Sequence, residues 1–349
     1  MGFPVLRLPF LIFDNVYQFL DVPEVILFSQ CSKNMKTIVK SKEGPSKEYS
    51  LVVTIEAKNT CVRLQQHDPS FKTLFIWTLY MGKRLLWDSD KVISDDGARI
   101  GAVELTMKEA DDKWRSTVKK EDYERKILAI VKLFKDIFSC RIGKLILDWD
   151  AGASFRKLFM ESDELHVVDT MEFYHDFCTQ EHMTFMLDHF DAGFLKIISD
   201  FGPGFSYSKP LKKFPRLELQ YSSWINLSHL LQLAKTGTSI ELENSDMITD
   251  KDLNQFIKWW IGSDTKDLEV MFLNRSNGNR DITAVMEGIP STPARKKHDH
   301  EIPLFDSILV DWFDKALDIC RKDGTQATVM VVDTWFALGV PQKQKQGNI

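Results

Sequence analysis

The first 42 residues alternate short apolar runs with helix-start signals, and this pattern predicts three short helices. Four apolar residues near the start fall at helical spacing: Ile12, Val16, Phe19 and Leu20. Asp21 and Pro23 mark the start of a second helix, since proline fits a first helical turn and an acid suits the positive end of the helix dipole. Ser32 is placed to cap a third helix. Because so short a piece buries little core, it should pack on its own chain or on a partner.

Residues 43–140 carry the pattern of a β-rich connecting region that ends in an amphipathic helix. Strands are predicted at 49–56, 61–66 and 71–80, where β-branched and aromatic residues are dense. Residues 107–126 are rich in mixed charges, which predicts a solvated loop that leads into a helix over 121–139. In that helix the apolar residues repeat at the spacing of one helix face: Ile127, Ile130, Val131, Phe134, Ile137 and Phe138.

From residue 141 onward, pairs of apolar residues that flank one other residue recur at steps of 22–28 residues. The pairs are Leu145/Leu147, Met171/Phe173, Leu195/Ile197, Leu217/Leu219, Ile240/Leu242 and Leu268/Val270. Two intervals contain clear helices, and Thr249 with Asp252 forms a capping box at the start of the second. A strand followed by a helix at this period is typical of leucine-rich repeats, in which each unit covers its neighbour's apolar face. The Asn/Cys ladder of that family is missing, so the match is to architecture only.

The sequence after residue 273 predicts a loop insert, a β-hairpin and a tail. Residues 274–303 are polar and rich in Gly and Pro, which predicts a loop insert. Residues 316–332 predict a β-hairpin around Asp323-Gly324 that caps the stack, and residues 341–349 a frayed tail. The predicted fold class is therefore α+β or an α/β repeat, with three N-terminal helices followed by a degenerate leucine-rich-repeat-like βα stack that has β-hairpins at its ends.

Composition argues against nucleic-acid and membrane partners, but it does not indicate what kind of protein the chain binds. The chain has 349 residues, 44% hydrophobic and 27% charged, with a net charge of −5. A broad nucleic-acid-binding face would need a basic balance, so no nucleic-acid partner is predicted. The five cysteines are scattered and odd in number, which favours a reducing compartment, the cytoplasm or the nucleus. Since no apolar run reaches the roughly 18 residues of a membrane span, no membrane partner is predicted.

One group of residues has spacing that resembles a metal site. His175, Cys178 and His182 are separated by two and three residues, with His166 and His189 nearby. No second cysteine pair follows, and the group straddles a predicted strand–helix junction. We therefore predict no metal and no cofactor, and a metal-dependent hydrolase is the weakest of three function hypotheses.

The N-terminal pattern resembles an F-box. The residues that carry the resemblance are Leu8-Pro9, Val16, Leu20-Asp21, Glu24, Ser29, Cys31-Ser32, Met35 and Ile38. The rest of the chain resembles the type-2 F-box-associated domain of the expanded nematode F-box family. Its most specific stretches are Trp224–Leu231, Ile240–Ser245, Thr249–Ile261 and Asp318–Val329.

The resemblance implies a domain order and a function. The F-box would span residues 1–42, the connecting region 43–140, the F-box-associated repeat-like domain 141–340 and the tail 341–349. Such a protein is expected to be a non-catalytic substrate receptor of an SCF-type cullin–RING ubiquitin ligase, bridging the Skp adaptor and an unknown target protein. It accelerates transfer by proximity and orientation. The alternative is a non-ligase repeat-type binding module whose F-box sequesters the adaptor.

Two sets of candidate contact residues follow. For the adaptor face we predict Leu8, Pro9, Ile12, Val16 and Leu20, because the N-terminal piece has more large apolar residues than its interior can absorb; alternatively, some pack on residues 43–140. For the target, the residues between the apolar pairs point to the other, concave face: Ile146, Glu172, Lys196, Glu218, Glu241 and Glu269, followed outward by Asp148, Tyr174, Ile198, Gln220, Glu243 and Met271. Glu218, Glu241 and Glu243 are acidic on adjacent strands and could bind a basic segment; alternatively, they form a solvated acidic face.

Overall fold

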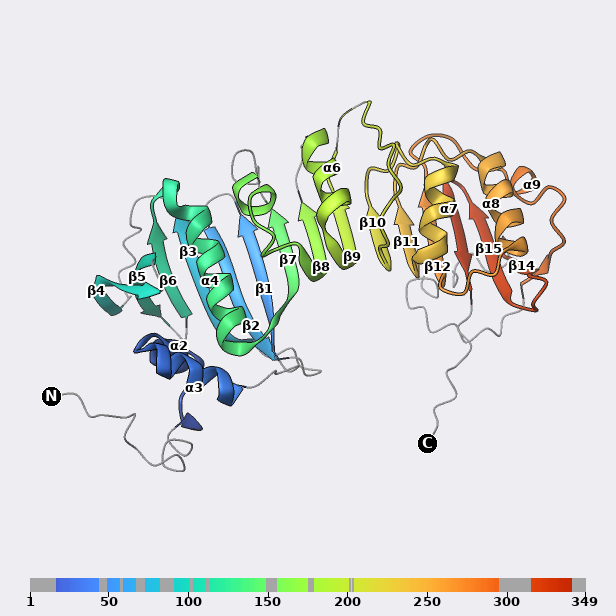
Figure 1. The fold of residues 1–349 in the computed structure, drawn as a ribbon. Coiled ribbons are helices and arrows are strands. Elements are labelled where there is room, and N and C mark those ends of the chain that lie inside the picture. The colour runs from blue at the N-terminus through green and yellow to red at the C-terminus, as the bar shows by residue number, and fades with distance from the viewer. Residues whose placement is uncertain are drawn as a thin grey trace, which may run out of the picture. The chain divides into compact units, whose positions relative to one another are not determined.

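The computed structural model describes residues 17–43, 49–56, 59–66, 73–81, 91–100, 103–110, 113–148, 156–174, 179–200, 202, 204–294 and 315–340 (Figure 1). The chain divides into two compact units, residues 1–169 and residues 170–349. Each unit combines helices with strands of a mixed sheet, as predicted for the fold class.

Two helices begin the described part of unit 1, α2 (Val22–Gln30) and α3 (Lys33–Glu43). Asp21 caps α2 in a capping box with Glu24: the Glu24 N–H donates to Asp21 Oδ1 at 2.9 Å, and the Asp21 N–H donates to Glu24 Oε2 at 3.0 Å. Ser32 Oγ accepts the Met35 N–H at 3.1 Å. The second and third predicted helices are confirmed, and the first falls mostly on residues 1–16, outside the described part.

The sheet of unit 1 has the strand order β7-β1-β2-β3-β6-β5-β4. The hairpin of β1 (Tyr49–Glu56) and β2 (Asn59–Gln66) and the next strand β3 (Thr73–Met81) confirm the three predicted strands. β1 pairs in parallel with β7 (Arg141–Asp148), and β3 pairs in parallel with β6. The remaining elements are β4 (Lys91–Ile100), β5 (Val103–Ala110), β6 (Lys113–Val118), a 3-10 turn η2 (Lys120–Asp122), α4 (Tyr123–Phe138) and a π-helical turn η3 (Arg156–Met160).

The core of unit 1 forms where α4 packs on the sheet. All six residues of the predicted apolar face of α4 are buried, which confirms that helix. Phe134 of α4 stacks on Phe75 of β3 at 5.9 Å between ring centroids. Trp114 of β6 packs edge-on against Phe75 at 5.1 Å and against Trp77 at 4.9 Å. These rings fix the helix to the sheet through large apolar contacts.

The loop predicted over residues 107–126 is wrong in its first half. Residues 103–110 and 113–118 are the antiparallel strands β5 and β6. Trp114 is only 1% exposed, and Ser116 Oγ accepts the Trp77 Nε1–H at 3.0 Å. The charges obscured a period-2 alternation in which Trp114, Ser116 and Val118 face inward.

Ion pairs join α3 to α4. Asp136 of α4 binds the Nζ of Lys36 at 2.9 Å and that of Lys40 at 3.4 Å. Burial alone would raise the pKa of Asp136, but the two lysines outweigh it and lower the pKa below its ordinary value of 3.8. Beside these pairs Met35 and Val39 of α3 are buried, so one face of the N-terminal piece packs on the unit's own body.

Replacement of Asp136 by asparagine should lower the free energy of unfolding by less than about 1 kcal/mol at neutral pH, because its partners are half-exposed. Since the folded-state pKa of Asp136 is lowered, its contribution is present above the unfolded pKa and is lost as pH falls through the folded value. The difference from wild type should therefore shrink below about pH 4. Urea titrations at several pH values measure it. Asp122→Asn is the control, because Asp122 pairs with Arg125 and not with α3; a larger effect of that control would contradict the assignment.

Unit 2 contains a parallel sheet extended by antiparallel strands, in the order β13-β14-β15-β16-β12-β11-β10-β9-β8. The division between the units falls inside β8 (Val167–Tyr174). Strands β9 (Asp191–Ile198), β10 (Arg216–Leu219), β11 (Ser239–Leu242) and β12 (Val270–Asn274) are parallel. Strands β14 (Leu317–Cys320), β15 (Gln326–Val332) and β16 (Trp335–Gly339) are antiparallel, with short β13 (Thr292–Pro293) at the edge.

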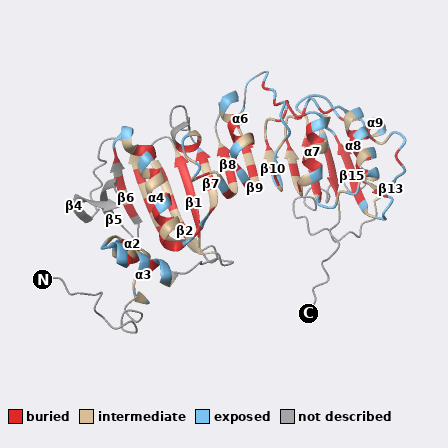
Figure 2. Cartoon of the chain, in the orientation of Figure 1, coloured by how far each residue is buried: buried red, intermediate tan, exposed pale blue. Residues whose placement is uncertain are grey.

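Three helices cover one face of this sheet: α6 (Gln180–His189), α7 (Leu227–Thr236) and α8 (Asp250–Gly262) (Figure 1). Buried residues lie in the strands and in the helix sides that face them (Figure 2). The register aligns Leu195, Leu217 and Ile240 across β9 to β11, and each is at most 1% exposed. The strand–helix alternation and the Thr249–Asp252 capping box are confirmed, whereas the likeness to leucine-rich repeats stays a prediction.

The last predicted pair, Leu268/Val270, is out of register. Ile240 pairs with Met271 and Leu242 with Leu273, so the aligned pair in β12 is Met271/Leu273. Met271 is fully buried, which overturns its predicted outward position, and Glu269 lies just before the strand. Because β12 is buried along both faces, the period-2 signal that would fix its register is absent.

The predicted insert over residues 274–303 is only partly a loop. Residues up to 294 include α9 (Ile282–Val285) and β13, and residues 295–303 lie outside the described part. The predicted hairpin is confirmed as β14 and β15, with Gly324 at a φ of 83° in its turn. It does not lie directly beside the last parallel strand, because β16 pairs with both β15 and β12.

Candidate protein-interaction surfaces

The N-terminal piece keeps apolar side chains in solvent although half of it is covered. Val25 and Ile26 of α2 are buried, whereas Phe19 is 86% exposed and Leu27 is 41% exposed. Of the predicted adaptor residues, Leu20 is half-buried, and Leu8, Pro9, Ile12 and Val16 lie outside the described residues. The choice between the adaptor face and packing on residues 43–140 therefore stays a prediction for these residues. Phe19 and Leu27 are surface residues that sequence reasoning did not assign to the adaptor face.

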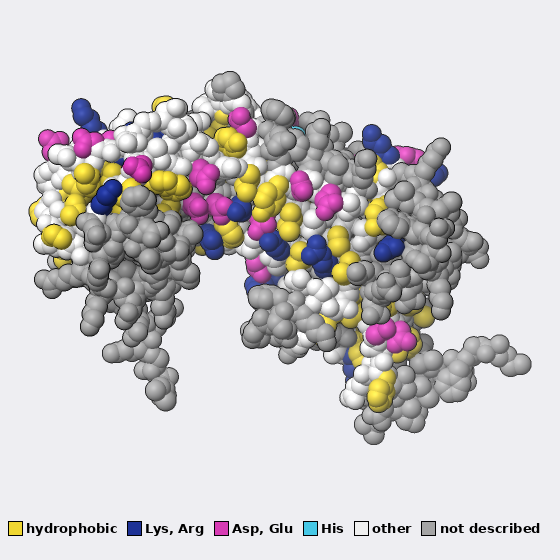
Figure 3. All heavy atoms as spheres, turned by 180° about the vertical axis from the view of Figure 1, so that it is seen from behind, with side chains coloured by type: hydrophobic (Ala, Val, Ile, Leu, Met, Phe, Trp, Pro, Cys, Tyr) yellow, Lys and Arg dark blue, Asp and Glu magenta, His cyan; other side chains and the backbone are white. Residues whose placement is uncertain are grey.

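The second surface is the face of unit 2 opposite α6, α7 and α8, which we call the helix-free face. Alternation along the strands places on it Phe194, Lys196 and Ile198 of β9, Arg216, Glu218 and Gln220 at β10, and Glu241 and Glu243 at β11. Most of these side chains are half-buried, in contrast to the fully buried residues between them. Figure 3 looks from this side and shows acidic and basic side chains interleaved with hydrophobic ones.

Of the three glutamates predicted to contact the target, Glu218 has an ion-pair partner on the helix-free face. Glu218 forms a direct ion pair with Lys196, its register partner on β9. The Arg216 guanidinium lies over the Phe194 ring at 4.2 Å from its centroid. Glu218 is therefore neutralised, a contact that sequence reasoning missed although the two residues occupy the same position in successive repeats.

Glu241 and Glu243 have no such partners. Neither side chain forms a hydrogen bond or an ion pair with any residue that the structure describes. Burial first, and then the nearby charges of Glu218 and Glu243, raise the pKa of Glu241, with Lys196 and Arg216 opposing the rise. Glu241 and Glu243 are thus acidic side chains of the helix-free face that have no direct ion-pair partner among the described residues.

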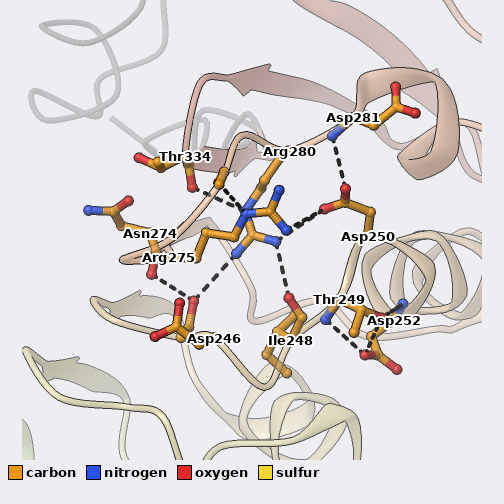
Figure 4. Close-up of polar contacts among 12 residues, drawn as sticks. Asp246, Ile248, Thr249, Asp250, Asp252, Asn274, Arg275, Arg280, Asp281 and Thr334 are labelled. Carbon is orange, nitrogen blue, oxygen red and sulfur yellow. Dashed lines mark hydrogen bonds and ion pairs between the residues drawn. The ribbon is translucent and has the colours of Figure 1, made fainter.

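A buried arginine near the amino end of α8 is structural (Figure 4). The side chain of Arg280 is 0% exposed and donates to the carbonyl oxygens of Thr334 and Ile248, both at 3.2 Å, and pairs with Asp250 at 3.4 Å. Asp250 also accepts the Asp281 N–H at 2.9 Å. Every contact of this cluster joins segments of unit 2 to one another, so it stabilises the loop after β12 and offers no open site.

One pocket of about 540 Å³ lies at the carboxyl ends of α7 and α8, lined by Lys235, Trp259 and residues 263–267. Trp260 is 1% exposed, and its neighbour Trp259 is half-buried at the pocket wall. The tandem tryptophans thus supply one buried ring for packing and one half-buried ring at the pocket wall. The lining mixes ammonium and carboxylate groups without a nucleophile and base in hydrogen-bond contact.

No group of three His, Cys, Asp or Glu residues that could hold a metal ion occurs among the described residues. His175 and Cys178 of the metal-like spacing lie outside them. His189 stacks on Phe185 at 4.3 Å between centroids, and the His166 ring bonds to the Phe159 carbonyl at 2.6 Å. None of the helices in the described ranges has the length and apolarity that a membrane crossing requires.

Comparison with protein families supplies two matches. Residues 5–47 match the model of the F-box domain, and residues 209–273 match the model described as F-box associated. No curated protein and no solved structure matches the chain. An F-box implies binding to the Skp adaptor within an SCF-type ligase, and F-box proteins typically serve there as non-catalytic substrate receptors. The chain therefore carries an F-box domain followed by an F-box-associated domain.

Proposed function

We propose that this protein is the substrate-recognition subunit of an SCF-type cullin–RING ubiquitin ligase and a member of the expanded nematode F-box family. The observation that carries the proposal is the order of the two domain matches, each of which falls within one compact unit. The F-box binds the Skp adaptor, and the repeat-like unit 2 holds the target. Ubiquitin transfer then gains from proximity rather than from chemistry by this chain.

The adaptor surface comprises Leu8, Pro9, Ile12, Val16 and Leu20, to which we add Phe19 and Leu27. Phe19 and Leu27 support the proposal because they expose large apolar side chains on a small helical piece whose other face is already packed. Burial of each such side chain against a partner contributes about 1.5–3 kcal/mol before the costs of association.

The double variant Phe19→Asp/Leu27→Asp should weaken binding to purified Skp adaptor by about tenfold or more, because two apolar anchors are replaced by charges. The matched control is Met247→Asp, an equally drastic change at a residue of unit 2 that is 60% exposed. Affinity is measured by isothermal calorimetry with the full-length chain. Undiminished affinity of the double variant, or an equal loss in the control, would contradict the assigned surface.

Co-purification separates the ligase role from its alternative. Affinity purification of the chain with the proteasome inhibited should recover the adaptor together with cullin. Recovery of adaptor without cullin would instead support a binding module that sequesters the adaptor. Loss of both from Leu8→Ala/Pro9→Ala would show that the Leu-Pro pair contributes to the contact.

The target side of the proposal rests on the helix-free face. Glu218, Glu241 and Glu243 were the predicted contacts with a basic segment; the ion pair of Glu218 with Lys196 leaves Glu241 and Glu243 as the stronger candidates. Glu241 in β11 and Glu243 just after it lie on the same face and repel each other, and a basic segment relieves that repulsion. The alternative role of these residues is a solvated acidic surface that favours solubility.

A further inference from the structure

The helix-free face is fully buried at its antiparallel end. Phe272 of β12 pairs in register with Glu241, so it lies on that face, and Ala337 of β16 and Met330 of β15 continue the same row. Phe272 is 2% exposed, and Ala337 and Met330 are each 1% exposed. They belong to one buried apolar cluster, which we call the end cluster: Val270, Phe272, Ala316, Met330, Val332 and Ala337.

The same face is only half-buried over the parallel strands, as Phe194, Ile198 and Glu241 show. Side chains on a sheet face keep part of their surface in solvent unless a second layer covers them. None of the described helices of unit 2 supplies that layer for the end cluster. Helices α6, α7 and α8 cover the opposite face (Figure 1), and α9 is bound to α8, where Asn254 Nδ2 donates to the Val285 carbonyl at 2.8 Å. Another part of the chain must therefore cover the end cluster.

Residues 295–314 are the stretch of unit 2, outside the described residues, that can supply this layer. Both of its neighbours lie at the end cluster: Ala316 is a member, and Ala294 packs against it. The remaining stretches of unit 2 outside the described part are residues 175–178, 201, 203 and 341–349. None of these carries a run of large apolar side chains.

Within this stretch, residues 302–313 have the sequence pattern of an amphipathic helix. Ser307 and Asp314 fall outside the apolar face that the pattern predicts. Ten residues of helix are about 15 Å long, which is the width of four strands spaced about 4.8 Å apart. The end cluster lies on four neighbouring strands, β14-β15-β16-β12. The apolar residues that share one face at spacings of three and four are Leu304, Phe305, Ile308, Leu309 and Trp312.

We propose that residues 302–313 pack as an amphipathic helix on the end cluster and form the second layer of unit 2 there. The apolar side chains of the stretch and of the cluster are then removed from water together. This layer closes the antiparallel end of the helix-free face and leaves the rows of β9 to β11 as its accessible part. That those rows face a target rests on the proposed receptor function, whereas the packing itself does not.

The test compares two neighbouring positions of β15 that face opposite ways. Met330 belongs to the end cluster, whereas Val329 lies on the face that the helices cover. Met330→Cys and Val329→Cys are made separately in the full-length chain. Alkylation by N-ethylmaleimide is followed by mass spectrometry of residues 323–343, a tryptic peptide without a native cysteine. When residues 302–313 are replaced by Gly and Ser, position 330 should react about 100-fold faster, and position 329 should stay protected.

A milder variant and a matched control complete the experiment. Ile308→Ser/Trp312→Ser should raise the reaction rate at position 330 about tenfold, because it removes two apolar contacts of the layer. Ser307→Ala/Asp314→Ala, on the other side of the same pattern, should leave that rate unchanged. Urea titration shows whether each variant is folded.

Three results would overturn the inference. They are an unchanged rate at position 330 in the Gly/Ser chain, an equal rise at positions 329 and 330 in the milder variant, and an effect of the control as large as that of Ile308→Ser/Trp312→Ser. Neither adaptor nor target takes part in the measurement. Its failure would therefore leave the proposed receptor function standing, and failure of adaptor binding would leave the packing standing.

Discussion

Replacement of Arg280 by alanine is expected to lower the free energy of unfolding of unit 2 by about 3–5 kcal/mol, because it removes the nearer cation from Asp250 and the donor from two backbone carbonyls and a hydroxyl. The guanidinium donates to the carbonyl oxygens of Thr334 and Ile248, to Asp250 at 3.4 Å and to the Ser245 hydroxyl at 3.5 Å. Burial, and then the nearby Arg275, lowers the pKa of Arg280, so the environment already opposes its charge. Without it, three segments of unit 2 lose their common donor.

Arg275→Ala is the matched control for this prediction. Arg275 donates to the Gly278 carbonyl but lies 3.7 Å from Asp250 and is partly exposed, so its loss should cost about 1 kcal/mol. Arg280→Lys keeps the positive charge but loses the planar set of N–H donors. Its loss in free energy of unfolding should lie between those of Arg275→Ala and Arg280→Ala. Urea denaturation measures each change, and amide hydrogen exchange assigns it to unit 2. A cost of Arg280→Ala no larger than that of Arg275→Ala would disprove the structural role.

Replacement of Trp114 by alanine should destabilise unit 1 by about 3–5 kcal/mol, since a fully buried indole is lost and its neighbours close the cavity only in part. The ring packs edge-on against Phe75 and Trp77, and Phe75 in turn stacks on Phe134 of α4. Loss of Trp114 therefore weakens the packing of α4 on the sheet as well as the sheet itself. Because α3 is paired to α4 through Asp136, adaptor binding at elevated temperature should fall together with stability.

Two further variants separate volume from hydrogen bonding. Trp114→Phe retains a ring in the cavity and should cost clearly less than Trp114→Ala. Ser116→Ala removes the acceptor of the Trp77 N–H and should cost about 1–3 kcal/mol through a buried unpaired donor. Chemical denaturation followed by tryptophan fluorescence measures all three. Equal stability of Trp114→Ala and wild type would show that β6 does not belong to the core.

The elements predicted correctly are those in which apolar residues keep the regular spacing of a helix or a strand. The helix face of α4, the helix start at Asp21, the capping box at Thr249, and the aligned residues of β9 to β11 follow from spacing alone. These features are local, because a cap or an amphipathic face needs only a few neighbouring residues.

The wrong predictions concern residues whose structure is determined by contacts with segments distant in the sequence. In β6 a single large apolar residue, Trp114, holds the strand in the core against a charged background. In β12 both faces are buried, so the pattern does not distinguish Leu268/Val270 from Met271/Leu273. Arg280 sits in a polar stretch, and nothing in its neighbourhood distinguishes a buried cation from a solvated one. For the candidate surfaces, alternation placed the glutamates on one face, but their pairing depends on which strand lies beside which.

The contact between β13 and β14 has a consequence for engineering. The Ala294 N–H donates to the Ala316 carbonyl at 3.0 Å, and Pro293 pairs with Leu317. Residues 294 and 316 are thus held side by side by backbone pairing, so chain added between them begins and ends at two neighbouring points. Doubling such a stretch costs only about 0.6 kcal/mol in closure entropy. A reporter or affinity tag inserted between residues 294 and 316 would leave both anchors paired, which makes this position a practical attachment site for capturing targets.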